Sequence, residues 1–170
     1  SGLKGIPVYE PAEYGLQNVE GAMLTGERHI VIRLAREFFE KELGDRVKLE
    51  TPIGELDDPA WDFTVDCTFS ALNSDSIDRY EPCVMGILEG PAFKAVTIMD
   101  GMFPSIYPWD EENGLSSITS ASLTPITKAC KTYSEARFIL DGVTKSIAFA
   151  RVDEMVRQMA HFWPNVHDIY

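Results

Sequence analysis

The chain has 170 residues, which is enough for one domain with a hydrophobic core, and 45% apolar and 25% charged content is ordinary for a globular protein. Its net charge of -12 disfavours nucleic acid and anionic membrane surfaces as partners, because binding to both depends on clusters of Lys and Arg. No apolar run approaches the roughly 18 residues of a membrane-spanning helix, and no signal peptide is visible, so we expect a cytoplasmic protein.

Cysteine usage agrees with that expectation. Cys67, Cys83 and Cys130 are an odd number of thiols without CxxC spacing. We therefore expect reduced thiols, two of them buried in strands.

The first secure element is a helix. Residues 1–24 show little periodicity and predict an extended arm with at most one short strand. Apolar residues then recur at helical spacing from Ile30 to Phe39, with Thr25 as the expected N-cap and Gly44 just after the stop. The pattern predicts a helix over about 26–43, with a charged face that we interpret as solvated surface.

Four stretches are then predicted to be strands, and the first two alternate apolar and polar residues, as half-buried strands do. They are residues 47–51, 63–70, 80–89 and 93–99, the last two being consecutive strands joined across Glu89-Gly90-Pro91. Asp66 falls on the face opposite Phe63 and Val65, where we interpret it as a solvated or hydrogen-bonded carboxylate of the sheet.

The stretch from Val96 to Trp109 concentrates the most unusual features of the chain. An apolar strand breaks at the turn signal Asp100-Gly101, and prolines follow at positions 104 and 108. Alternate positions then carry Phe103, Ser105, Tyr107 and Trp109. Because proline cannot donate to a ladder, we expect an edge strand, a bulge or a ligand-facing rim.

Two interpretations of this stretch remain open from the residues alone. In one, the aromatic side chains simply close a core at the sheet edge. In the other, they wall a binding site, in which Tyr80, Glu81, Asp100 and Tyr107 form a polar pocket on the sheet.

The remaining elements complete the predicted fold. An acidic loop over 110–114 leads to a Ser/Thr-rich strand over 115–123. From Ser134 the pattern is helical, first in a short piece and then in a long apolar stripe that ends at Pro164. We predict one α+β domain over residues 1–170, with a mainly antiparallel sheet of five to seven strands and two main helices packed on one side.

Familiar catalytic motifs are absent from the sequence, which contains no GxGxxG, P-loop, HExxH, GxSxG or EF-hand loop. The histidines at positions 29, 161 and 167 are scattered, so we predict no metal site. Neither Cys67 nor Cys83 has an adjacent basic residue in sequence to activate it as a nucleophile.

The order of several short patterns nevertheless resembles a known family. These are KELGDRVKLET, WDFTVDCTFSALN, YEPCVMGILEGPAFKAVTIMDGMFPSIYPW and LSSITSASLTP. Over about residues 20–127 they are similar to the middle of FAD-dependent oxidoreductases of the D-amino acid oxidase (glycine oxidase-like) superfamily.

The resemblance implies roles for particular residues. The segment Val65-Asp66-Cys67-Thr68 matches the strand end that runs close to the flavin, so Asp66, Cys67 and Thr68 are candidate cofactor contacts. The substrate-binding sheet would face the isoalloxazine ring. On it, Phe103, Tyr107 and Trp109 would wall the pocket, and Tyr80, Asp100 and Ser105 would supply polar contacts.

Members of that family begin with a strand–GxGxxG–helix unit that seats the FAD pyrophosphate, and this sequence has no such unit. We therefore expect a substrate-binding part that is not catalytic alone, binds FAD weakly or not at all by itself, and acts with a flavin-binding subunit or a missing domain on a small molecule. The alternative is a non-catalytic module of the same fold that binds partners or forms homo-oligomers.

Overall fold

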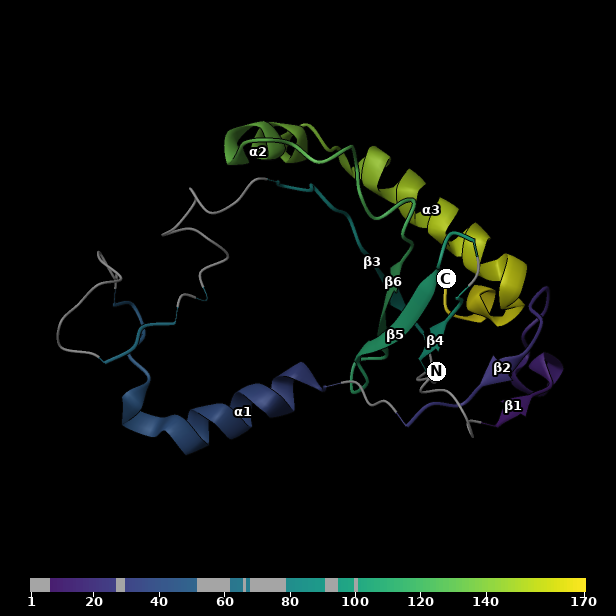
Figure 1. Cartoon of the computed structure of the whole chain (residues 1–170), viewed down its shortest axis with the longest axis horizontal. Helices are drawn as coiled ribbons and strands as arrows, with labels where there is room; N and C mark the ends of the chain where they lie inside the picture. Colours follow the sequence, from purple (N-terminus) through teal and green to yellow (C-terminus); the bar gives the residue numbers. More distant parts are fainter. Residues whose placement is uncertain are drawn as a thin grey trace.

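The computed structural model describes residues 7–26, 30–51, 62–65, 67, 79–90, 95–99 and 101–170 (Figure 1). Three helices and two antiparallel sheets, of two and four strands, make up its regular structure in these ranges. The strands are β1 (Val8–Tyr9), β2 (Ala22–Met23), β3 (Gly86–Glu89), β4 (Val96–Thr97), β5 (Ser105–Asp110) and β6 (Leu115–Thr119). The helices are α1 (Ile32–Leu43), α2 (Tyr133–Asp141) and α3 (Lys145–Phe162), followed by the 3-10 turn η4 (Pro164–Asp168). The fold is α+β, as predicted.

The larger sheet has the order β3-β6-β5-β4, with every pair antiparallel. β5 and β6 form a hairpin across the acidic turn, where Gly114 takes a φ of 64° that favours glycine. β3 and β4 are consecutive in the chain but lie at opposite edges of this sheet.

The core lies between one face of this sheet and α3. Its buried side chains come from the sheet (Leu88, Ile98, Ile106, Ile118), from α3 (Met155, Val156, Met159) and from the C-terminal segment (Trp163, Val166, Ile169). Gly86 marks the closest approach, because a β-carbon there would lie 2.8 Å from Cγ1 of Val152 on α3. The predicted apolar stripe of the last helix is therefore the element that covers the sheet, and the helix ends just before Pro164, as expected.

The N-terminal arm is tied to the same core. Leu16 and Val19 pack against it, and the N–H of Gln17 donates to the carbonyl of Phe162 at 2.8 Å. β1 and β2 pair with each other, where the sequence predicted at most one strand.

Helix α1 confirms the predicted helix, but it begins at Ile32 with Val31 at the N-cap, so the proposed cap at Thr25 is wrong. Gly44 ends it with a φ of 49°, as the sequence indicated. In Figure 1 α1 stands away from the sheet, on the side opposite α3.

Two predicted strands are not seen in the described ranges. Residues 47–51 form no strand and turn at positions 49–50. Of the strand predicted over 63–70, residues 63–65 are irregular, with Phe63 and Val65 largely exposed, and residues 66 and 68–70 lie outside the described residues. A strand needs a neighbour to pair with, and the described parts of the chain offer none at these positions. The larger sheet accordingly has four described strands, and the predicted count of five to seven in one sheet is not confirmed.

No helix in the described ranges is both long and apolar enough to cross a membrane.

Candidate functional site

The sheet face opposite α3 is the surface on which the predicted aromatic residues lie. Register places Ile87, Ser117 and Tyr107 side by side across β3, β6 and β5, and Thr97 beside Ser105. Paired residues share a face, and the intervening positions, such as Leu88, point into the core. We call the row of Ile87, Ser117, Tyr107, Ser105 and Thr97 the open face.

Tyr107 has its hydroxyl fixed on this face. The hydroxyl is 2.5 Å from Oγ1 of Thr97 on β4, and Oγ of Ser117 donates to the carbonyl of Tyr107 at 3.5 Å. Its side chain stays accessible, with 39% of the residue surface exposed. The ring is therefore held in one orientation while its edge remains available to a ligand.

Trp109 follows Tyr107 at a β-bulge. Pro108 pairs with Ser116 and Asp110 with Leu115, so Trp109 is the extra residue of β5 and is 43% exposed. β4 pairs only with Ser105 and Ile106, so the missing N–H of Pro108 breaks no ladder bond on that side. The sequence-based expectation of a bulge is confirmed, although β5 is an inner strand.

Phe103 opens the segment with an unusual backbone. Its φ is 47°, a left-handed value that is uncommon for an aromatic residue. The conformation is fixed from both sides, because the carbonyl of Met102 accepts from the N–H of Ala121 at 3.0 Å and Pro104 is fully buried. Such local strain is common at ligand sites.

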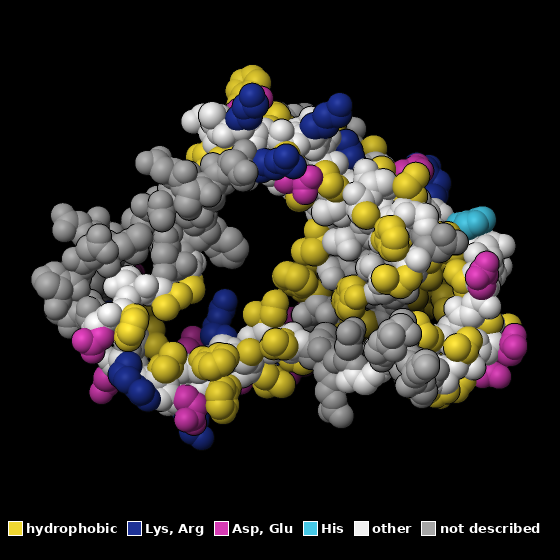
Figure 2. Space-filling model, viewed as in Figure 1, with side chains coloured by type: hydrophobic (Ala, Val, Ile, Leu, Met, Phe, Trp, Pro, Cys, Tyr) yellow, Lys and Arg dark blue, Asp and Glu magenta, His cyan; other side chains and the backbone are white. Residues whose placement is uncertain are grey.

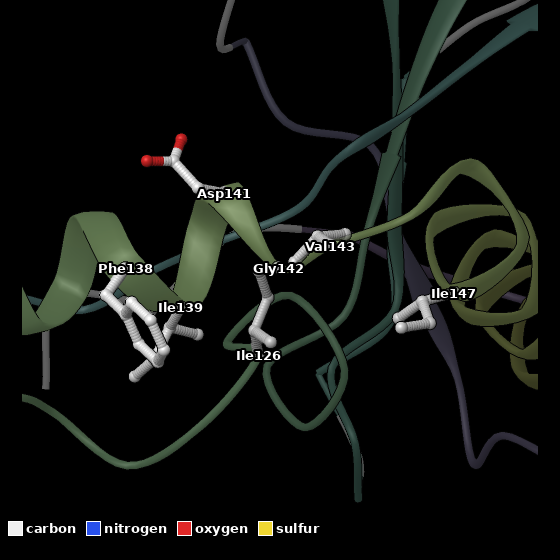
Figure 3. Close-up of a pocket in the computed structure, with 7 residues that line it drawn as sticks. All are labelled: Ile126, Phe138, Ile139, Asp141, Gly142, Val143 and Ile147. Atoms are coloured by element: carbon white, nitrogen blue, oxygen red, sulfur yellow. The ribbon is translucent and has the colours of Figure 1, made fainter.

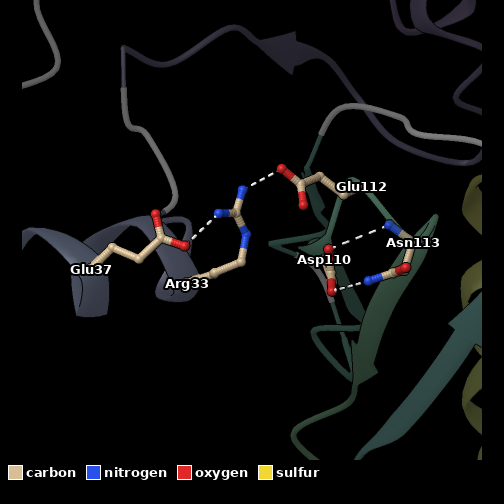
Figure 4. A network of polar contacts seen from close by, with 5 residues as sticks. All are labelled: Arg33, Glu37, Asp110, Glu112 and Asn113. Atoms are coloured by element: carbon tan, nitrogen blue, oxygen red, sulfur yellow. Dashed lines mark hydrogen bonds and ion pairs between the residues drawn. The ribbon is translucent and has the colours of Figure 1, made fainter.

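An acidic turn closes one end of the open face (Figure 4). Asn113 donates to Asp110 from its side chain at 2.6 Å and from its backbone at 3.3 Å, and the side-chain bond is the main reason that the pKa of Asp110 is lowered. Arg33 of α1 reaches this turn and pairs with Glu112, while also binding Glu37 at 2.6 Å. The pKa of Arg33 is raised, chiefly by the hydrogen bond with Glu37.

The other predicted site residues either lie away from the open face or fall outside the described residues. Tyr80 pairs with Cys130 and stacks edge-on against Tyr133 of α2, with ring centres 6.0 Å apart. Cys67 is exposed, whereas Asp66, Thr68 and Asp100 lie outside the described residues. The predicted polar pocket that joins Tyr80 to Tyr107 is therefore not found among the described residues.

Sequence reasoning missed three contributors to this surface. Thr97 and Ser117 position Tyr107, and Arg33, interpreted as solvated surface, joins α1 to the acidic turn. Thr97 had a signal, because it lies within the strand predicted over residues 93–99. Arg33 had none, since its partner is 79 residues away.

A pocket at the junction of α2 and α3 is a second candidate site (Figure 3). Its lining is aliphatic and aromatic except for one carboxylate: Ile126, Phe138, Ile139, Asp141, Gly142, Val143 and Ile147. The carboxylate of Asp141 points away from the pocket in Figure 3 and pairs with Arg137 at 3.0 Å. The lining therefore offers shape but no group for chemistry, and we place the candidate site on the open face.

The thiols and acidic groups suggest no other site. Cys130 is buried, whereas Cys67 and Cys83 are exposed, so the expectation of two buried thiols is wrong. Partial burial raises the pKa of Cys83, and burial, with Glu135 nearby, raises that of Cys130. Within the described ranges, no three His, Cys, Asp or Glu side chains converge as metal ligands would.

Comparison with known proteins gives one informative match. The chain is 32% identical over 173 aligned residues to the FAD-dependent monooxygenase FPY4 of Fusarium mangiferae. The alignment covers 94% of this chain and 46% of the relative, so the chain spans about half the length of the curated relative that it matches. No family model matches the chain, and no solved structure does. The chain is thus similar to part of a FAD-dependent oxidoreductase.

Proposed function

We propose that this chain is the substrate-binding part of a FAD-dependent oxidoreductase that acts on a small molecule, and that it is not catalytic alone. The relative is FAD-dependent by name, which supports FAD as the cofactor of the intact system. The observation that carries the proposal is the open face, an accessible sheet surface on which aromatic and hydroxyl side chains lie together. We also propose the finer relationship, to the D-amino acid oxidase-like superfamily, on the motifs described above.

The described residues fit one end of FAD and not the other. The mixed surface of Ile87, Tyr107 and Thr97, with Ser117 buried between the first two, suits an aromatic ring system or a substrate held against one. A pyrophosphate needs free N–H groups at a helix start or a glycine-rich turn. The side chains of Thr132 and Thr144 already accept from the first turns of α2 and α3, whereas no side chain caps the start of α1. Since the sequence has no glycine-rich motif leading into any of these helices, we infer that the phosphates are held by another part of the intact system.

When bound, the flavin would supply the redox chemistry of the reaction. The residues of this chain would bind and orient the substrate. The Tyr107 hydroxyl donates or accepts one hydrogen bond beside Thr97, and Ser105 offers a second hydroxyl in the adjacent row. Trp109 and Ile87 exclude water from the surface that they cover.

The alternative is the non-catalytic module that binds a partner or another copy of the chain. The exposed apolar residues of α1 are the observation that favours it. A cytoplasmic location, small-molecule binding and the absence of nucleic-acid partners remain part of the proposal, and the net charge of -12 supports the last of these.

Riboflavin is a suitable probe because it carries the isoalloxazine ring without the pyrophosphate. We expect the chain to quench riboflavin fluorescence with a dissociation constant of about 0.1–1 mM, because this chain would supply only one side of the binding site. Tyr107→Ala should abolish the quenching. Tyr133→Ala provides a matched control, because Tyr133 is an exposed tyrosine on α2.

Equal weakening by both substitutions would show that the binding is non-specific, and no quenching by the wild-type chain would remove the open face as a flavin-facing surface. Circular dichroism of each variant separates these results from unfolding. A self-associating chain that ignores riboflavin would favour the alternative module.

A further inference from the structure

Helix α1 carries an apolar stripe that nothing in the described structure covers. Ile32, Ala35, Phe39 and Leu43 recur at three- and four-residue spacing, the period of one helix face, with Leu34 and Phe38 flanking them. None of the twelve residues of α1 is buried, and its five large apolar side chains are 40–57% exposed. We call this surface the α1 stripe.

The α1 stripe is not part of the core between the sheet and α3. Neither the buried members of that core nor the side chains packed around it include a residue of α1. The side-chain contact described between α1 and the sheet is the ion pair of Arg33 with Glu112. Figure 2 shows hydrophobic side chains along α1 and along the sheet side of the opening between them.

A helix of this length is marginal by itself in water, and most helical stability in proteins comes from packing an amphipathic face. A stripe of this size is also larger than the scattered apolar residues of ordinary surfaces. Packing in a second core, to which α1 is the contribution of the described residues, would account for this stripe.

The relative indicates what completes that core. More than half of the FAD-dependent relative lies outside the match, and the matching chain has no glycine-rich dinucleotide motif. The unit that holds the dinucleotide of the relative is expected in its unmatched part. That unit must contact the matched part if flavin and substrate are to meet.

We propose that the α1 stripe is the docking surface of the flavin-carrying portion of the protein. This inference rests on the proposed function and extends it. The charged residues that flank the stripe, such as Arg36, Glu40 and Lys41, would form the polar rim that surrounds such interfaces. Because Arg33 joins α1 to the turn at the end of β5, a portion seated on the stripe lies next to the open face.

The first test uses the chain as it is, with Phe39→Glu and a matched control, Phe138→Glu, at an exposed phenylalanine on α2. We expect neither substitution to lower the melting temperature, and the amides of α1 to exchange hydrogen at least about a hundredfold faster than those of α3. Slow exchange in α1, or a large loss of melting temperature in Phe39→Glu alone, would place α1 in the core of this chain and overturn the proposal. A dimer that Phe39→Glu dissociates would assign the stripe to a second copy and overturn it too.

The second test replaces the matching part of the Fusarium protein with residues 7–170 of this chain. In this chimera we expect the amides of α1 to be protected about as well as those of α3, and Phe39→Glu, but not Phe138→Glu, to remove that protection. Unprotected α1 amides in a folded chimera that retains flavin would contradict the proposal.

The two proposals fail in different ways. If α1 is protected in the chimera but Tyr107→Ala leaves riboflavin quenching unchanged, docking stands and the open face is not the substrate side. If Tyr107→Ala abolishes quenching and α1 stays unprotected, the proposed function stands and the docking surface lies elsewhere.

Discussion

Gly86 is the position at which the packing of α3 on the sheet is most sharply testable. A β-carbon added there would lie 2.7 Å from Cγ2 of Ile118, 2.8 Å from Cγ1 of Val152 and 3.0 Å from its Cγ2. Carbon atoms in favourable contact are roughly 3.5–4.0 Å apart, so each neighbour has to move by more than half an ångström. Ile118 is fully buried and β-branched, which leaves it little freedom to yield.

Gly86→Ala should therefore destabilise the protein by about 2 kcal/mol, within the range of overpacked cores, despite the gain that an alanine usually gives in a strand. The assay is urea denaturation followed by circular dichroism, with the slope compared between variants. Val152→Ala in the Gly86→Ala background should recover part of the loss, since it removes two of the clashing carbons.

Gly26→Ala is the matched control, because a β-carbon at Gly26 has no neighbour within 4 Å. If Gly86→Ala behaves like Gly26→Ala, α3 does not lie against β3 as described, and the assignment of one sheet face to the core and the other to a ligand is wrong.

Three further predictions concern single side chains. Arg151→Met should lower the free energy of unfolding, measured by urea denaturation, by about 2–3 kcal/mol, because the guanidinium donates to three backbone carbonyls after β6 at 2.9–3.1 Å. An unchanged free energy of unfolding would contradict that role. Since the pKa of Asp110 is lowered in the folded state, the carboxylate stabilises the fold above about pH 4, and this stabilisation is lost as the pH falls through the folded-state pKa. Asp110→Asn should therefore flatten this part of the curve of stability against pH. An unchanged curve would show that the hydrogen bond to Asn113 is not responsible. Iodoacetamide at neutral pH should modify exposed Cys67 well before buried Cys130, whose thiol pKa is raised, as read by mass spectrometry; equal rates would mean that Cys130 is accessible.

The elements that the sequence predicted well are those whose pattern depends on the chain alone. The helical period gave α1 and α3, and glycine and proline gave their ends at Gly44 and Pro164. Alternation over 103–109 placed Ser105 and Tyr107 on the same face. The prolines indicated an edge, a bulge or a ligand-facing rim, and the structure has the bulge, in an inner strand.

The elements that the sequence predicted poorly are those that depend on distant partners. Residues 47–51 alternate as a strand does but form none, because alternation cannot say whether a partner strand is present. The placement of β3 and β4 at opposite edges follows from the β5–β6 hairpin that lies between them in the sheet. Tyr80 was expected beside Tyr107, but its strand segment pairs with Cys130 and not with the hairpin.

The most direct test of the account is the affinity of the purified chain for FAD relative to riboflavin, measured by flavin fluorescence after recording its visible spectrum. We predict a colourless protein that binds FAD no more than about threefold tighter than riboflavin, because the described residues offer a ring-facing surface and the sequence has no glycine-rich motif for the phosphates. A yellow protein as purified, or FAD bound at least about tenfold tighter than riboflavin, would mean that this chain holds the dinucleotide itself and would contradict the account.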